Sequence, residues 1–129
     1  MRVVGFAAVL RLHDRLIREH GGKPGTINEG AIDAALQRPH SGFGDVECFP
    51  GVFRKAAAVA HSLATTHPFA DANKRTGLAV AIATLHLNGF ELDATGEEEE
   101  QAVLDLVIGN TTLEDFAGWL EEHSFPLAE

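Results

Sequence analysis

Cysteine is almost absent from this chain of 129 residues, in which Cys48 is the single one. One cysteine cannot form an internal disulfide, which excludes the small disulfide-stabilised scaffolds of secreted proteins. No redox motif surrounds Cys48, so its side chain is predicted to be a small, half-buried hydrophobe. A reducing compartment fits best, and we expect a cytoplasmic protein.

Long hydrophobic runs are also missing. No apolar stretch approaches the ~18 residues that a membrane-spanning helix requires, although 45% of the residues are hydrophobic and 22% are charged, as in folded globular domains. Residues 3–10 are apolar, but Arg11, His13 and Arg15 follow them directly, and no small-residue cleavage site follows. This pattern indicates an amphipathic helix rather than a signal peptide, and we expect no membrane partner.

Basic residues are scarce in the second half of the chain. The net charge of −9 argues against direct nucleic-acid binding, because such binding needs a basic face. Residues 1–64 carry 8 Lys and Arg against 6 Asp and Glu, whereas residues 65–129 carry 2 against 13. Those two cations are neighbours, Lys74 and Arg75. An isolated basic pair in an acidic half of the chain suggests a local anion site.

Apolar residues recur with helical spacing along nearly the whole chain. This periodicity predicts an all-α fold, a compact bundle of about six helices in a single domain, residues 1–129. The first helix is expected to end near residue 20, and a second, short helix should follow Asn28. Two further helices are expected over residues 52–65 and 78–87. The fifth should begin near residue 97, and the last should follow Thr112. Residues 78–87 are apolar nearly all round, which predicts the buried central helix.

Shorter patterns predict further details of this fold. Asn28 and Thr112 are predicted helix N-caps. Glycines and prolines in residues 38–51 predict a loop with room for a short hairpin, and residues 90–94 are expected to be extended. The inner face of the helix that begins near residue 97 is predicted to hold Val103, Leu104, Val107 and Ile108.

Residues 67–77 concentrate polar side chains suited to phosphate chemistry, directly before the apolar helix. Asp71 stands where an N-cap is expected, so the next three backbone amides could bind an anion. Lys74 and Arg75 on the first turn add positive charge, and Arg75 can hold two phosphate oxygens. A Mg²⁺ ion would let the Asp71 carboxylate lie beside phosphates. His67 can act at the same point as a general base.

Each of these residues also has a purely structural interpretation. A loop histidine is usually only polar, Asp71 is by default a helix cap, and Lys74 and Arg75 could be a solvated pair. Phe69 suggests scaffolding, a ring set in the core to hold the turn. The functional interpretation is favoured because all of them fall within eleven residues, 67–77.

The motif His-Pro-Phe-x-Asp-x-Asn-Lys-Arg at residues 67–75 resembles that of the Fic/Doc superfamily, in the form typical of Doc (death-on-curing) toxins. Leu12-His13-Asp14, the segment Gly-Gly-Lys-Pro-Gly at residues 21–25 and the chain length are similar too. The resemblance covers nearly the whole chain and implies a Fic/Doc-like helical fold.

The resemblance also implies a role for each motif residue. His67 would be the base that deprotonates the target hydroxyl, and Phe69 would be the buried anchor of the motif. Asp71 would help to position the metal-bound phosphates. Asn73 and the amides at the helix start would form the anion site, and Arg75 would bind nucleotide phosphate.

Two positions depart from the Fic pattern, in which glycine stands in place of Lys74 and a second arginine in place of Leu78. Doc proteins share both departures, with Lys74 filling part of the phosphate site. The resemblance then implies a kinase that uses ATP and Mg²⁺ and transfers the γ-phosphate to a threonine of elongation factor Tu, which blocks translation. A Fic-type protein adenylyltransferase and a catalytically inactive antitoxin-binding module stay open as alternatives.

The sequence carries no Ser/Thr-x-x-x-Glu-Gly/Asn motif of the kind that marks the inhibitory helix of Fic proteins; residues 25–30 come nearest, with Gly25 at the Ser/Thr position. The resemblance therefore implies the toxin of a type II toxin–antitoxin pair, inhibited in trans by a separate antitoxin. A metal phosphohydrolase built on His13 and Asp14 would need a further histidine upstream, which residues 1–12 lack. Zinc binding is disfavoured, because no two histidines have the i, i+4 spacing of ligands on a helix.

Overall fold

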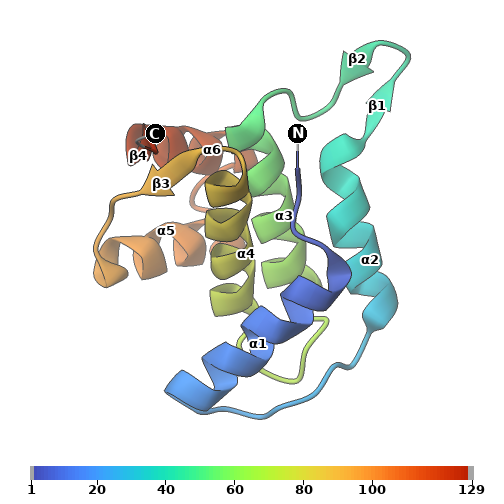
Figure 1. Ribbon diagram of the computed structural model, residues 1–129, viewed down its shortest axis with the longest axis vertical. Coiled ribbons are helices and arrows are strands. Elements are labelled where there is room, and N and C mark those ends of the chain that lie inside the picture. Colours follow the sequence, from blue (N-terminus) through green and yellow to red (C-terminus); the bar gives the residue numbers. More distant parts are fainter. Residues whose placement is uncertain (1, 128–129) are drawn as a thin grey trace.

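The computed structural model describes residues 2–127, and Figure 1 shows its ribbon. Within this range the chain forms six α-helices: α1 (Phe6–His20), α2 (Glu29–Gln37), α3 (Val52–Thr66), α4 (Asn73–Leu87), α5 (Gly96–Ile108) and α6 (Leu113–Glu122). One turn of 3-10 helix, η1 (Arg38–His40), follows α2. The predicted helical fold is confirmed, and α4 begins at Asn73, earlier than the apolar segment that predicted it.

Two small antiparallel sheets accompany the helices. β1 (Gly42–Phe43) pairs with β2 (Val46–Glu47), which confirms the hairpin expected in the loop before α3. β3 (Phe90–Leu92), within the segment predicted to be extended, pairs with β4 (Ser124–Pro126). Nothing local predicts β4, because it is three residues long, contains a proline and depends on a partner strand that precedes α5.

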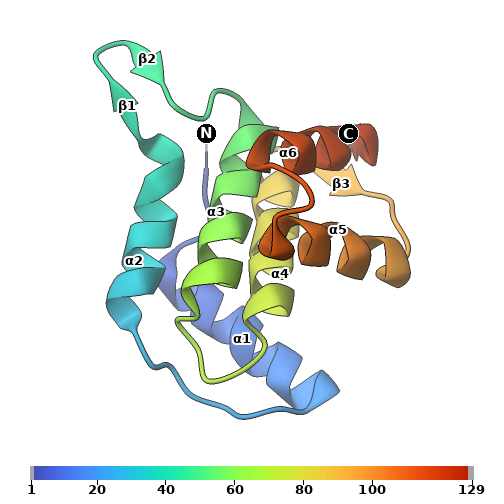
Figure 2. The same cartoon turned by 180° about the vertical axis from the view of Figure 1, so that it is seen from behind.

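The helices α3 and α4 run side by side through the middle of the molecule, with α1 and α2 on one side and α5 and α6 on the other (Figures 1 and 2). The two central helices approach closely because small residues face each other. A Cβ atom added at Gly77 would lie only 2.7 Å from the carbonyl oxygen of Ala60. α4 is buried over much of its length, as predicted, and α3 is buried over still more of it. The turn between them therefore starts and ends in tightly packed helices.

The predicted helix caps are confirmed. The side chain of Asn28 accepts a hydrogen bond from the amide of Ala31 at 3.1 Å, at the start of α2. Thr112 accepts from the amide of Asp115 at 3.0 Å, at the start of α6. No helix in residues 2–127 combines the length and the apolar character needed to cross a membrane.

Two predictions about burial are wrong. Leu104 and Ile108, expected on the inner face of α5, are 39% and 59% exposed, whereas Leu106 is buried together with Val103. α5 lies at the edge of the bundle and has neighbours on one side only, so a narrow stripe of it is covered. Cys48, expected to be half-buried, is exposed, because it follows β2 in the hairpin segment that projects from the bundle (Figure 1).

Candidate active site

The turn that joins α3 to α4 has a left-handed backbone at both ends. His67, which ends α3, has φ 51°, and Ala72, which precedes α4, has φ 63°. Such conformations of residues other than glycine cost about 1–3 kcal/mol and persist where the surrounding structure enforces them. The prediction that Asp71 is the N-cap is wrong by one residue: Ala72 takes that position, and no side chain caps α4.

The middle of this turn is fixed to the core. Phe69 is 1% exposed, and its ring stacks on that of His13 from α1. The side chain of Asn73 makes two hydrogen bonds to the backbone of Phe69. Its Oδ1 accepts from the Phe69 amide at 3.0 Å, and its Nδ2 donates to the Phe69 carbonyl at 3.1 Å. Nδ2 also lies 3.5 Å from Nδ1 of His67. The Asn73 side chain thus holds the turn in shape.

Two backbone amides hold the carboxylate of Asp71. Oδ1 accepts from the amide of Ala72 at 2.8 Å, and Oδ2 accepts from the amide of Lys23 at 3.1 Å. These hydrogen bonds, helped by the nearby charges of Lys23 and Arg75, hold the pKa of the Asp71 carboxyl below its ordinary value. The carboxylate is therefore ionised at neutral pH and keeps a defined direction.

The segment after α1 pairs with the turn and was given no role by the sequence alone. The amide of Ala70 donates to the carbonyl of Gly25 at 3.1 Å, and Thr26 forms an antiparallel bridge with Phe69. This pairing brings the amide of Lys23 to Asp71. The glycines and proline of residues 21–25 predict a loop, but nothing in them shows which part of the chain that loop contacts.

A pocket of about 600 Å³ opens beside the turn. Every polar residue that the sequence singled out for phosphate chemistry lines it: His67, Asp71, Asn73, Lys74 and Arg75. Within the described residues 2–127, no protein group accepts from the amides at positions 73–75, and no ion pair involves either cation. A helix start with unpaired amides and two unpaired cations suits an anion.

α5 forms a wall of this pocket, and the sequence pattern assigned its residues no role there. Glu100, Val103 and Leu104 of α5 line it, together with Leu78 of α4 and Gly21 at the end of α1. Leu104 was expected in the core and instead contributes an apolar side chain to the pocket. No local pattern could have found this wall, because α5 reaches the motif only through the packing of the bundle.

Comparison with known proteins decides the family. A sequence model of the Fic/DOC family matches residues 5–85, a range that contains α3, the turn and nearly all of α4. The chain belongs to the Fic/DOC family. It is 42% identical over 74 residues to toxin Doc of Mycolicibacterium smegmatis, a match that covers 57% of each chain. It is 32% identical over 112 residues to protein kinase doc of Escherichia phage P1, a match that covers 87% of this chain and 84% of that protein.

The pocket of this Fic/DOC chain offers one carboxylate to a metal ion. In the part of the chain that the structure describes, no group of three or more His, Cys, Asp or Glu side chains could hold a metal by itself. Mg²⁺ is commonly bound by one or two carboxylates together with substrate phosphates and waters. Asp71 is exposed and ionised, and each of its oxygens keeps a lone pair beyond the amide that it accepts. This donor set fits a magnesium ion that shares its shell with a bound nucleotide.

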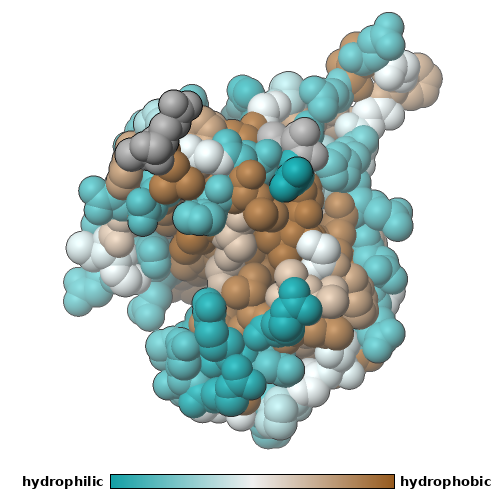
Figure 3. Space-filling view, viewed as in Figure 1, coloured by the Kyte–Doolittle hydropathy of each residue, from teal (hydrophilic) through white to brown (hydrophobic). Residues whose placement is uncertain are grey.

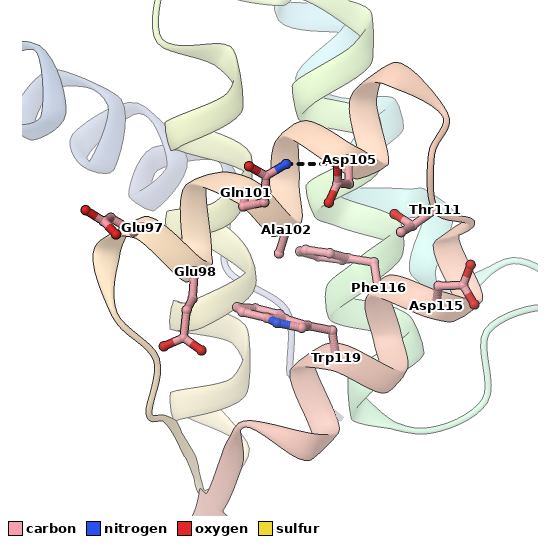
Figure 4. A pocket seen from close by; sticks show the side chains of 9 residues that line it. All are labelled: Glu97, Glu98, Gln101, Ala102, Asp105, Thr111, Asp115, Phe116 and Trp119. Atoms are coloured by element: carbon pink, nitrogen blue, oxygen red, sulfur yellow. Dashed lines mark hydrogen bonds between the residues drawn. The ribbon is translucent and has the colours of Figure 1, made fainter.

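A second pocket, of about 490 Å³, lies between α5 and α6 of this Fic/DOC chain, and Figure 4 shows the nine side chains that line it. Phe116 and Trp119 give it an apolar side, and four carboxylates lie around it. Two of these, Glu98 and Asp115, accept from backbone amides at the helix starts, which lowers the pKa of both carboxyls. None of the nine residues is a cation or a histidine. Of these two pockets, the one beside the α3–α4 turn is the one lined by cations and a histidine, the groups that suit a phosphate.

Proposed function

We propose that this chain is the toxin of a type II toxin–antitoxin pair and acts as a protein kinase, which transfers the γ-phosphate of ATP to a threonine of elongation factor Tu and so blocks translation. The observation that carries this proposal is the pocket where His67 and Asp71 meet the open start of α4. The names of the two relatives, a toxin and a protein kinase, support it. This target would require a cytoplasmic location.

The phosphates of ATP would bind at the start of α4. The amides of residues 73–75 lie at the positive end of the helix dipole, where anions are stabilised. Arg75 would grip two phosphate oxygens with its planar guanidinium, and Lys74 would add a point charge. Bound Mg²⁺ on Asp71 would neutralise charge on the phosphates. Phosphoryl transfer depends mainly on positioning and charge neutralisation, both of which these groups would supply.

His67 would take the proton from the threonine hydroxyl. Histidine is the side chain most often used as a general base. The ring of His67 is exposed on the pocket, so a hydroxyl group of a docked protein can reach it. The side-chain amide of Asn73, 3.5 Å from Nδ1, limits how the ring can turn. The substitution His67→Ala should therefore abolish growth arrest while the circular dichroism spectrum stays that of the parent.

Two side chains at the start of α4 favour transfer of the terminal phosphate over transfer of AMP. Lys74 is exposed on the pocket and occupies part of the space that a second phosphate would need. Leu78 is 8% exposed, and it gives the pocket an apolar side chain where a second arginine would hold another phosphate. With fewer phosphates held at the amides, the terminal phosphate is the group presented to His67.

Labelled ATP separates the candidate activities. The chain is incubated with elongation factor Tu and ATP labelled at the α- or the γ-phosphate, with His67→Ala as the control that should transfer nothing. Label from the γ-phosphate alone is the expected result. Label from the α-phosphate would replace the kinase by an adenylyltransferase. No label from either position would overturn the proposed target and favour an inactive antitoxin-binding module.

We also propose that the antitoxin docks between α1 and α4. An apolar groove of about 780 Å³ runs there, and Figure 3 shows hydrophobic surface gathered over α4 above the polar end of α1. Arg11, Arg15 and Arg18 of α1 also line the groove. An amphipathic helix with acidic residues beside its apolar face fits this combination. The double substitution Arg11→Glu, Arg15→Glu should weaken antitoxin binding and leave phosphate transfer unchanged; unchanged antitoxin affinity would refute this docking site.

A further inference from the structure

His13 is a buried polar side chain that the proposed chemistry does not use. It lies on α1 and is 2% exposed. Its ring is stacked on Phe69, with centroids 3.9 Å apart and planes 8° from parallel. Its Nε2 lies 2.9 Å from the backbone carbonyl oxygen of Asp71. Both contacts are made to the turn between α3 and α4, so His13 is buried against the motif rather than elsewhere in the core.

The hydrogen bond between His13 and Asp71 shows which ring nitrogen of His13 carries a hydrogen. A carbonyl oxygen can only accept a hydrogen bond, so Nε2 of His13 carries a hydrogen and donates it to Asp71. That carbonyl and the amide of Ala72 belong to the same planar peptide unit. The amide end of the unit donates to Oδ1 of Asp71 at 2.8 Å. One peptide plane is therefore held at both ends, by His13 and by the Asp71 carboxylate.

The orientation of this peptide plane matters for the site. Ala72 has φ 63°, a conformation that needs external support in a residue with a side chain. If the plane rotated, the Asp71 carboxylate would lose the amide of Ala72, and the first amides of α4 would change direction. The carboxylate and the helix start are the two parts of the pocket proposed to hold Mg²⁺ and phosphate.

We propose that His13 is a positioning residue for phosphate transfer: by donating to the carbonyl of Asp71 it fixes the peptide plane between Asp71 and Ala72, and so the direction of the carboxylate. This inference rests on the function proposed above. The stack on Phe69 places the imidazole, and the hydrogen bond from Nε2 acts on the site. A variant that keeps a ring but lacks the donor should therefore be impaired.

Two substitutions separate the ring from the donor. His13→Phe keeps a flat ring against Phe69 and has no donor, whereas His13→Gln can place an amide nitrogen where Nε2 stands. His13→Phe should lower kcat for γ-phosphate transfer by about tenfold or more and raise the Mg²⁺ concentration for half-maximal rate, with little change in KM for the protein substrate. His13→Gln should recover most of the loss. His40→Phe, a change at an exposed histidine on η1, is the control and should behave as the parent.

Amide hydrogen exchange tests the same inference without any substrate. If His13 holds the peptide plane, the amide of Ala72 should exchange about tenfold or more faster in His13→Phe than in the parent, and at the parent's rate in His13→Gln. Parent-like exchange and Mg²⁺ dependence in His13→Phe would overturn the inference. Impaired transfer and faster exchange in His13→Gln would overturn it as well, because the ring and not the donor would then be decisive.

The exchange measurement also keeps the two proposals apart. If the parent transfers no phosphate, the proposed kinase activity is refuted, and the exchange rates of Ala72 still decide the role of His13. If His13→Phe fails to fold, the role is decided by His13→Gln, which should then keep the parent's exchange rate and Mg²⁺ dependence.

Discussion

Replacing Gly22 with alanine should disable the proposed kinase, because the new methyl group would press on the Asp71 carboxylate. Gly22 has φ 116°, and a Cβ atom there would lie 2.7 Å from Oδ2 of Asp71, well inside van der Waals contact. Oδ2 is the end of a side chain, so it would swing away and lose the amide of Lys23, now 3.1 Å distant. A misplacement of about 1 Å in a group that positions the reactants can lower the rate by about 100-fold, and we expect a fall in kcat of that order.

Gly25→Ala provides a matched control. Gly25 has φ 113°, close to that of Gly22, and a Cβ atom there would meet nothing within 4 Å. An alanine forced into such a conformation costs about 1–3 kcal/mol in either variant. With an unfolding entropy of about 0.27 kcal/mol/K for a chain of this length, each substitution should lower Tm by roughly 4–11 °C. The backbone strain should therefore be similar in the two variants, with a further loss of stability in Gly22→Ala where its Cβ would lie 3.1 Å from Cδ1 of Ile17. Gly22→Ala alone should lose its activity.

The assay combines the rate of γ-phosphate transfer, measured over a range of Mg²⁺ concentrations, with thermal unfolding followed by circular dichroism. Gly25→Ala should keep a rate close to that of the parent below its own Tm. Equal losses of kcat in Gly22→Ala and Gly25→Ala would refute the reasoning, because backbone strain would then explain the effect without any contact to Asp71.

Alanine should have opposite effects at two helical glycines when the free energy of unfolding is measured by denaturant titration. Gly77→Ala would press on the α3 backbone and should lower that free energy by about 1–2 kcal/mol. Gly118→Ala has open space around it and should raise it by about 0.5–1 kcal/mol. Arg75→Lys keeps the charge and loses the planar fork, so calorimetry should show about tenfold weaker binding of Mg·ATP than the parent; equal affinity would contradict this. Burial and the nearby Arg38 guanidinium lower the pKa of His61 from 6.5, so the folded state resists a proton that the unfolded chain accepts. The stability that depends on neutral His61 is complete above about pH 6.5 and is lost as the pH falls from there through the lowered pKa. Tm should therefore decrease as the pH falls through this range, and His61→Gln should make the decrease smaller.

Most of the helical structure could be predicted because helix formation depends on neighbours along the chain. Apolar spacing located all six helices of residues 2–127, and the side chains of Asn28 and Thr112 accept from amides three residues ahead, as an N-cap does. The polar residues of the motif could be placed in one pocket for a similar reason. They lie within residues 67–75, on a single turn and the first turn of α4, so they remain close in any fold that keeps α3 and α4.

The contacts that orient those residues could not be predicted. Asp71 was expected to cap α4, but Ala72 takes that place, because the bundle brings groups from other elements to Asp71. Its carbonyl accepts from His13, 58 residues earlier, and its carboxylate accepts from the amide of Lys23, 48 residues earlier. Leu104 was assigned to the core because its apolar character does not reveal that α5 is covered on one side only.

The sequence by itself determined the helical fold class, the helix caps at Asn28 and Thr112 and the grouping of the motif's polar residues beside one pocket, because each depends on groups a few positions apart. Tertiary structure alone decided the direction of the Asp71 carboxylate, the wall that α5 adds to the pocket and the groove between α1 and α4. These features depend on how distant helices pack, and packing is set by the shapes of many side chains together. That is why the residues of the candidate site could be picked out within nine consecutive positions, 67–75, while their arrangement required α1, α4 and α5.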